Sequence, residues 1–397
     1  MGKPILKSTI SKAFSSITYS VNSAIIVLLI LVYGCTNNDQ LKQTGMLDFS
    51  QADLMLEFLT ELHQGKQDSV ALEPILNAEG TKLIVKQMNI VRSVALDQYG
   101  QLLKGLSDNR LPQIEPVDST ERAKRGVHGL TNDIWMVLNW AEDHTDTLKQ
   151  ELALLKKADV YTKAENLANQ YLPEPLDVEP RLYLVMGGRA GAAALDGNNI
   201  YIDVLLMTFQ SVRKNIPLMN ETEAVEYFAH EMHHIGLARY HEKKYKSLTL
   251  NENQRRLFSM LKSIVAEGAA NYLISNHRNT DEMRKYFNLS NNPDKQEKLL
   301  NSFEELITEL SKGKFKNQDE YEKSNTLMLG LGYHMIGSVM LNIIDQAGGL
   351  ESINKVIADP AQLLIEYNKA AKMLNADNND LYIFNDTITG IVGKLSI

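Results

Sequence analysis

The chain has 397 residues, 44% of them hydrophobic, which is enough to bury one large domain or two and argues against disorder. Its formal charge is -8 and charges of both signs are scattered, so nucleic acid, which binds a concentrated basic face, is not an expected partner. The single cysteine excludes an internal disulfide, so disulfide bridges cannot stabilise the fold.

The amino-terminal end has the layout of an export signal. Basic residues precede an apolar run from Ala24 to Val32, which is shorter than the ~20 residues that span a bilayer. The residues just before Cys35 resemble a bacterial lipoprotein processing site, at which a lipid-modified cysteine becomes the new amino terminus. We therefore predict a lipoprotein signal peptide over 1–34, lipidation of Cys35 and a polar tether over 35–46. The exported protein would then be lipid-anchored to the cell envelope, on the outer side of a membrane. A plain signal peptide and an uncleaved anchor are the alternatives.

Helical spacing of apolar residues dominates from 47 to 172. Ser50 is the expected N-cap of the first helix, which should end before Gly65. Further helical stretches are expected at Leu83 to Leu106, Leu130 to Leu138, Leu148 to Leu155 and Ala164 to Tyr171. This region carries no recognisable chemical motif, so we interpret it as a helical bundle that packs against or shields the rest of the chain.

Prolines at 173, 175 and 180 indicate a domain boundary, because proline lacks an amide donor and disfavours helix in the residue before it. The apolar period then changes to two over 181–187 and again over 199–204, with glycines between the two stretches. These stretches predict a small sheet, expected to be antiparallel, and helix dominates after it. The predicted fold class is therefore α+β, mainly α, with a second domain over 173–397.

The segment that starts at Asn220 is predicted to be one amphipathic helix, with Asn220 as N-cap and Glu223 completing a capping box. His230 and His234 lie one helical turn apart on one side, which suits two imidazole nitrogens that converge on one metal ion. Glu231 is rotated by one residue, so it would lie near the metal without binding it and could take a proton from metal-bound water. The alternative is a set of histidines satisfied by ordinary hydrogen bonds.

A second amphipathic helix, Leu257 to Asn276, carries the expected third ligand of a Zn2+ ion. Glu267 lies among apolar residues, where an unpaired carboxylate is costly to bury and a metal ion would remove that cost. Zinc sites in hydrolases usually have three protein ligands and leave the fourth position to water. Small residues at 268–270 would let this helix approach the first one, and Asn271 is placed to brace a ligand imidazole. Glu252 is the second choice of ligand, and an ordinary exposed glutamate is the alternative for Glu267.

The His-Glu-x-x-His motif at 230–234, followed by a helix with Glu267 and Asn271, resembles the gluzincin branch of zinc metallopeptidases. Over roughly 181–349 the chain also resembles a bacterial family of zinc-dependent peptidases that is catalogued as a domain of unknown function. Asn271 stands where many gluzincins have aspartate, and the gap from His234 to Glu267 is longer than in thermolysin-like members. The resemblance implies a zincin-like catalytic domain that acts on peptide or protein substrates.

The resemblance also implies an edge strand beside the cleft that pairs with an extended peptide. Residues 188–195 are the candidate, and a flexible hairpin turn is the alternative. The expected substrate contacts are Ala192, Ala193 and Ala194. Gluzincins further place a tyrosine or histidine where it can donate to the oxyanion of the tetrahedral intermediate. Tyr333 is the expected donor here, in preference to His334, and a tyrosine that only packs in the core is the alternative.

Together these residues predict a hydrolytic mechanism. Zinc held by His230, His234 and Glu267 would lower the pKa of its water toward neutrality, and Glu231 would remove the proton and later return it to the leaving amine. Tyr333 would stabilise the oxyanion. Two other functions are compatible with the same residues: a non-catalytic zinc-binding or substrate-binding lipoprotein, and a zinc amidase that cleaves cell-wall crosslinks.

Overall fold

The structure, a computed structural model, describes most of the chain after residue 46. The described residues are 47–66, 71–92, 94–114, 121–157, 159–188, 191–195, 197–215, 217–275, 293–315, 320–321, 332–377 and 379–396. The predicted signal peptide, lipidated Cys35 and tether lie outside these ranges and stay predictions. Among the described helices, none has the length and apolar character required to cross a membrane.

The amino-terminal region is helical, as predicted. Its helices are α3 (Ser50–His63), α4 (Glu73–Asn77), α5 (Glu79–Arg92), α6 (Leu96–Ser107), α7 (Glu121–Glu142), α8 (Thr145–Lys157) and α9 (Val160–Asn169). Ser50 begins α3 but is not its N-cap, because Phe49 precedes it and the Ser50 amide donates to the Asp48 carboxylate at 2.7 Å. Leu47 and Asp48 are strand β1 rather than helix, since their backbone pairs with a distant strand.

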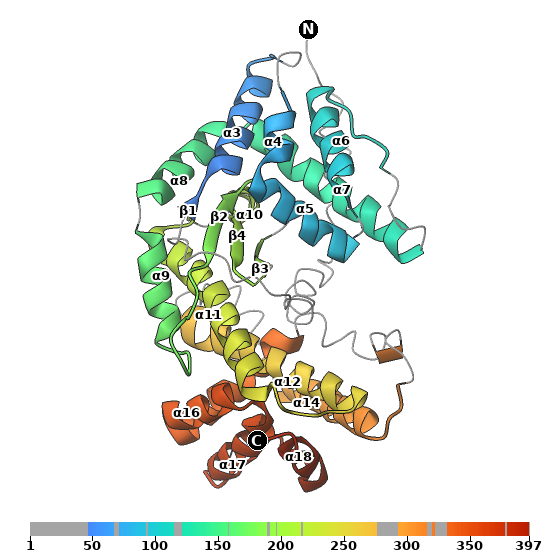
Figure 1. The fold of residues 1–397 in the computed structure, drawn as a ribbon, viewed down its shortest axis with the longest axis vertical. Coiled ribbons are helices and arrows are strands. Elements are labelled where there is room, and N and C mark those ends of the chain that lie inside the picture. Colours follow the sequence, from blue (N-terminus) through green and yellow to red (C-terminus); the bar gives the residue numbers. More distant parts are fainter. Residues whose placement is uncertain are drawn as a thin grey trace.

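A four-stranded mixed sheet lies between the amino-terminal helices and α11 (Glu221–Tyr245) (Figure 1). Its strands β1 (Leu47–Asp48), β2 (Arg181–Val185), β3 (Ala192–Leu195) and β4 (Asn199–Asp203) lie in the order β1-β2-β4-β3. The expectation of an antiparallel sheet is correct only for β3 and β4, whereas β1 with β2 and β2 with β4 are parallel. β3 and β4 form a hairpin that turns at Gly197 (φ 76°), and the hairpin joins β2 through β4. β4 therefore runs in the same direction as β2, and β3 lies at the edge.

The two faces of the sheet belong to different hydrophobic clusters, because successive side chains of a strand point to opposite faces. Tyr183, Val185, Ala193, Leu195 and Tyr201 pack with α3, α5, α6 and α7. Leu182, Leu184, Ala194, Ile200 and Ile202 pack with α9 and with α11 (Glu221–Tyr245). Helices from before residue 172 thus share both clusters with strands from after it, and the division into two domains at that point stays a prediction. The fold class, α+β and mainly α, is confirmed.

The second half of the chain is helical apart from the sheet. After α10 (Val204–Lys214) and α11 come α12 (Glu252–Ala269), the π-helix η2 (Ala270–Ile274), α14 (Pro293–Ser311), α16 (Tyr333–Ala358), η5 (Pro360–Gln362), α17 (Leu363–Asn375) and α18 (Asp386–Gly393). α12 begins five residues before the expected Leu257, because Asn251 caps it and its side chain accepts from the Gln254 amide. Residues 270–274, expected to continue this helix, form the π-helix instead, and the expected end at Asn276 lies outside the described residues.

α12 and α16 cross at a pair of glycines. A Cβ built on Gly268 would lie 2.6 Å from the backbone of Gly337, and a Cβ on Gly337 would collide with Ile264 O. Gly268 was expected to bring α12 close to α11, but it faces α16, while α11 packs against η2 as well as α12. The two helices can approach this closely only because neither glycine has a side chain.

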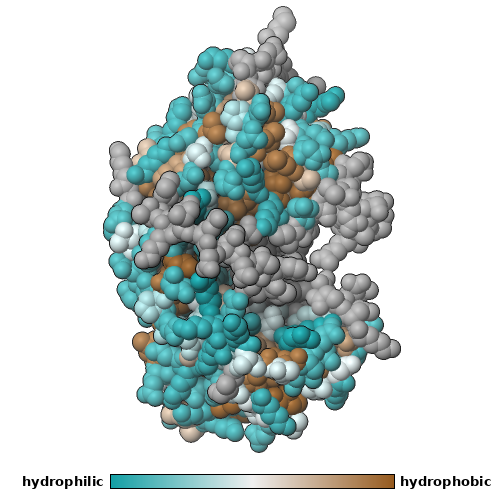
Figure 2. All heavy atoms as spheres, in the orientation of Figure 1, coloured by the Kyte–Doolittle hydropathy of each residue, from teal (hydrophilic) through white to brown (hydrophobic). Residues whose placement is uncertain are grey.

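On the face shown in Figure 2 the described surface is mainly hydrophilic, and its apolar patches lie over the amino-terminal helices and near the carboxyl-terminal ones. The large apolar side chains of the described residues are instead gathered in three interior clusters. The largest of these clusters surrounds α12 and α16. The two helices that cross at Gly268 and Gly337 are therefore closely packed with their neighbours.

Candidate metal centre

α11 presents two histidines on one side, as its sequence predicts. The capping box is present, because Asn220 Oδ1 accepts from the Glu223 amide at 3.0 Å and the Asn220 amide donates to Glu223 Oε2 at 2.9 Å. One turn separates His230 from His234, and their ring centroids are 4.6 Å apart at an interplanar angle of 89°. Both histidines are buried.

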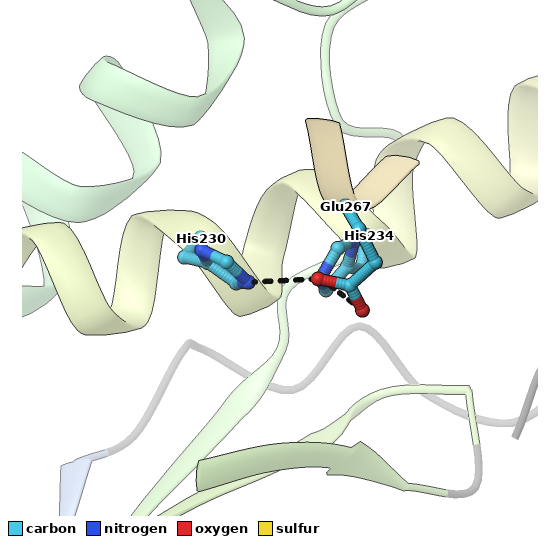
Figure 3. Close-up of side chains that lie close together, drawn as sticks. All are labelled: His230, His234 and Glu267. Carbon is cyan, nitrogen blue, oxygen red and sulfur yellow. Dashed lines mark ion pairs between the residues drawn. The ribbon is translucent and has the colours of Figure 1, made fainter. Parts of the chain in front are cut away.

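Glu267 reaches these histidines from α12. His230 Nε2 lies 3.7 Å from Glu267 Oε2, and His234 Nε2 lies 3.6 Å from Glu267 Oε1 (Figure 3). Two ligand atoms about 2.0–2.1 Å from a tetrahedral zinc ion are roughly 3.3–3.4 Å apart, so the observed spacing is close to that of a zinc site. The runner-up Glu252 instead has a side chain that is 66% exposed and pairs with Arg256.

The donor atoms fit a metal ion electrostatically as well as geometrically. Glu267 is only 2% exposed, and its Oε1 has no hydrogen-bond partner in the structure. His234 Nε2 also has no hydrogen-bond partner in the structure. Buried polar atoms are rarely left without a partner, because this costs free energy, and a zinc ion between them would satisfy both. Within the described ranges, His230, His234 and Glu267 form the group of three such side chains that could hold a metal.

The charges within this group oppose the effect of burial. Burial alone would raise the pKa of Glu267, but the neighbouring His334, His234 and His230 hold that pKa well below 4.5. Burial lowers the pKa of His234, yet the carboxylates of Glu267 and Glu231 outweigh it and raise that pKa above 6.5. The carboxylate is therefore ionised and ready to bind a cation, as zinc coordination requires.

Glu231 lies beside the histidines without belonging to the group of three. It is buried, and its charge raises the pKa of His234 as well as that of Tyr201 on β4. Glu231 thus lies close to the metal ligands but is not one of them. The motif predicts this position for a residue that exchanges protons with water. Its catalytic role stays a prediction.

The neighbouring His233 serves the packing of α11. Burial lowers the pKa of His233 to about 3, so the ring is neutral. Its Nε2 donates to Tyr171 O at 3.2 Å, in the segment that follows α9. This hydrogen bond links the middle of α11 to the chain just before the sheet.

Asn271 contacts the third ligand rather than a ligand imidazole of α11. Its Nδ2 donates to Glu267 O at 2.7 Å and lies 2.8 Å from His334 Nδ1. The group next to His230 is Ser275, whose Oγ lies 3.2 Å from His230 Nδ1. Ser275 was missed, because the π-helix over residues 270–274 that precedes it departs from regular helical spacing.

The two candidate oxyanion donors occupy different surroundings. Tyr333 is 1% exposed and belongs to the hydrophobic cluster around α12 and α16. The next residue, His334, places its Nδ1 2.7 Å from Glu267 Oε2. Tyr333 was expected to be the donor, and its role stays a prediction. His334 has a direct polar contact to Glu267 of the metal-binding group.

The predicted substrate strand is the edge strand β3, and it lies next to α11. Ala193 and Ala194 pair with Tyr201 and Ile200 of β4, so the opposite side of β3 is the outer edge of the described sheet. Ala194 packs on the α11 face, whereas Ala193 points to the amino-terminal helices. The edge position agrees with the expectation, and the binding of substrate there stays a prediction.

Two histidines four residues apart on one helix, an intervening glutamate and a third ligand from a second helix define a metal site of the kind found in hydrolases. A family model described as "Putative zinc dependent peptidase (DUF5700)" matches residues 78–376, and the chain belongs to this family. The match extends beyond the predicted 181–349 in both directions, from α5 to α17. Comparisons with curated proteins and with solved structures found no match. The predicted family is confirmed, and so is the zinc cofactor, because the family is described as zinc dependent and the three side chains can hold a metal.

Proposed function

We propose that the protein is a zinc metallopeptidase of the gluzincin type, with a zincin-like catalytic domain that hydrolyses peptide bonds. The observation that carries the proposal is the convergence of three buried ligand atoms from α11 and α12 within 4.8 Å of one another. Membership of a family described as zinc-dependent peptidases supports it. A glutamate from a second helix as the third ligand is the feature of the gluzincin type.

The residues around the metal have distinct roles in this proposal. Zinc held by His230, His234 and Glu267 supplies Lewis-acid chemistry, which makes water more acidic and a carbonyl more electrophilic. Glu231 takes the proton of the attacking water and returns it to the leaving amine. Because Glu231 is buried beside His234, bulk water has little access to this proton. Tyr333 is the proposed donor to the oxyanion.

The edge strand β3 is the proposed binding site for an extended peptide. A strand at a sheet edge has backbone groups that can pair with an added strand. Ala192, Ala193 and Ala194 have small side chains, so a substrate backbone can approach them closely. Gly191, directly before the strand, has a φ of 73°, a conformation that favours glycine.

The proposed site of action is outside the cytoplasmic membrane. The apolar run and Cys35 near the amino terminus support export and a lipid anchor. Labelling of the cellular protein with a radioactive fatty acid, compared with a Cys35→Ser variant, tests this location. The wild-type protein should carry the label and the variant should not.

Zinc analysis and hydrolysis of a broad peptide library by the purified protein test the proposed function. The Glu231→Gln variant should retain zinc and lose activity by about 100-fold or more, because it lacks the proton acceptor. Glu242→Gln, an exposed glutamate on the same helix, is the matched control and should keep activity. Full activity of the Glu231→Gln protein would refute the mechanism. A protein that binds zinc but hydrolyses nothing would be a non-catalytic binding protein. A protein that digests peptidoglycan but not protein substrates would be an amidase.

A further inference from the structure

The two ring nitrogens of His230 have different surroundings. Nε2 lies 3.7 Å from Glu267 Oε2, a contact drawn in Figure 3. Nδ1 is hydrogen-bonded to Ser275 Oγ at 3.2 Å. One nitrogen thus faces a second metal ligand, while the other is held by a side chain outside the group of three.

The Ser275 hydroxyl is buried against this ring. Ser275 is 4% exposed and His230 is 7% exposed, so bulk water has little access to compete for the hydrogen bond between them. A hydroxyl can donate its own hydrogen or accept another through the lone pairs of its oxygen. Ser275 can therefore accept a hydrogen from Nδ1.

Binding of zinc decides the direction of this hydrogen bond. An imidazole ligand uses the lone pair of one nitrogen for the metal, and its other nitrogen then carries the hydrogen. With Nε2 on zinc, the hydrogen of His230 lies on Nδ1 and requires an acceptor. Ser275 Oγ is at hydrogen-bond distance to accept it.

The π-helix η2 brings Ser275 to the ring. The Ser275 amide donates to Ala270 O, five residues back, which extends the wide turn of η2 up to Ser275. Ile274, directly before Ser275, is buried in the hydrophobic cluster that also contains Phe228 and Met232 of α11. The hydroxyl is consequently fixed against α11 by the backbone of η2 and by the packing of its neighbour.

Asn271, four residues before Ser275, contacts a different ligand. Its Nδ2 donates to Glu267 O at 2.7 Å and lies 2.8 Å from His334 Nδ1. Asn271 thus supports the ligand on α12, whereas Ser275 contacts a ligand on α11. The segment that begins at Glu267 therefore supplies one metal ligand and, through Ser275, a hydrogen bond to another.

We infer that Ser275 is a positioning residue that orients the His230 ring and stabilises the form in which Nε2 is free to bind zinc. The inference rests on the proposed function, of which this zinc site is a part. A group that accepts the second N–H of a ligand histidine fixes the orientation of the ring and makes it a better ligand. Without the hydroxyl, the Nδ1 hydrogen is buried without this acceptor when zinc binds, and the affinity for zinc falls.

Zinc affinity of the purified protein tests the inference independently of activity. The protein is depleted of metal with a chelator, and zinc is titrated back in competition with a chromophoric zinc indicator. Ser275→Ala should raise the Kd for zinc by roughly 10- to 100-fold, and an unchanged Kd would overturn the inference. Ser263→Ala is the matched control, because this buried serine of α12 donates to Ser259 O of its own helix, and its loss should leave the Kd unchanged.

Two further measurements separate the hydrogen bond from packing. Ser275→Thr keeps the hydroxyl and should retain most of the affinity, whereas an affinity as low as that of Ser275→Ala would overturn the inference. In zinc-bound protein labelled with 15N in its histidines, nuclear magnetic resonance should show a slowly exchanging Nδ1–H signal in the wild type and in Ser263→Ala. Ser275→Ala should lack this signal, and its persistence there would also count against the inference. If the wild type itself does not bind zinc, the proposed function falls together with the inference.

Discussion

Glu151 is a buried carboxyl group that should make the stability of the protein depend on pH. It lies on α8, is 3% exposed, and its Oε1 accepts from the Met219 amide at 3.2 Å. Its Oε2 contacts Thr208 Oγ1, which also lies 2.8 Å from Val204 O. A hydroxyl has one hydrogen and cannot donate to both oxygens. If Glu151 is protonated and donates to Thr208, and Thr208 donates to Val204 O, each of these oxygens takes part in a hydrogen bond.

The pKa of this group gives the sign and the size of the effect. Burial raises the pKa of Glu151 from 4.5 to about 7, the hydrogen bonds from Thr208 and Met219 lower it, and the charge of Glu223 raises it. The folded protein therefore binds the proton more tightly than the unfolded chain does. The resulting stabilisation is complete below about pH 4.5 and is lost as the pH rises to about 7. At about 1.4 kcal/mol per pH unit, the loss is about 3 kcal/mol at most.

The substitution Glu151→Gln tests this directly, because the amide can form both hydrogen bonds and never ionises. Near pH 5 the variant and the wild type should have similar free energies of unfolding, and near pH 8 the variant should be more stable by about 1–3 kcal/mol. Urea unfolding followed by circular dichroism measures both values. Glu57→Gln, an exposed glutamate on α3, is the control and should change little at either pH. A difference between Glu151→Gln and wild type that is equal at both pH values would refute the reasoning.

Three further predictions concern the metal centre. Glu267→Ala should reduce the zinc content of the purified protein to roughly a tenth or less, and unchanged content in metal analysis would count against Glu267 as a ligand. Zinc should raise the thermal midpoint of the metal-depleted wild type, since a ligand that binds only the folded state stabilises it by about 2.7 kcal/mol at 100 times its Kd; a midpoint that does not respond would contradict the site. Gly337→Ala should lower the free energy of unfolding by about 1–3 kcal/mol and weaken zinc binding, because its Cβ would collide with Ile264 O. Gly390→Ala in α18, where a Cβ meets no atom within 4 Å, is its matched control and should be neutral or slightly stabilising in the same unfolding assay.

The parts of the site that the sequence predicted depend on spacing within one helix. Asn220 and Glu223 form their capping box because the two side chains need only each other's backbone. His230 and His234 face the same way because residues four apart share a side of a helix. Glu267 could be predicted because a carboxylate on an apolar helix face needs a partner. Each of these arguments uses a single segment, so the rest of the fold was not required.

The parts that were not predicted depend on contacts between distant segments. Leu47 pairs with Leu182 in the sheet, and no local pattern indicates that partner or its parallel direction. From the sequence, Tyr333 was expected to be the donor in preference to His334. Neighbouring residues on a helix point about 100° apart, so the rotation of α16 about its own axis decides which of the two meets the carboxylate. That rotation is set by the crossing with α12 at Gly268.

The π-helix at 270–274 explains why Asn271 and Ser275 have the partners they do. A regular α-helix rotates by about 100° per residue, and a π-helical turn contains more residues, so side chains beyond it face a different direction. Ser275, at the end of η2, thereby reaches His230 Nδ1 on α11, while Asn271 stays with Glu267 and His334. An uninterrupted α-helix would give the Ser275 side chain a different direction. The metal centre thus uses an irregular turn to place one helix's side chains against both α11 and α16, which a search for regular periodicity cannot reveal.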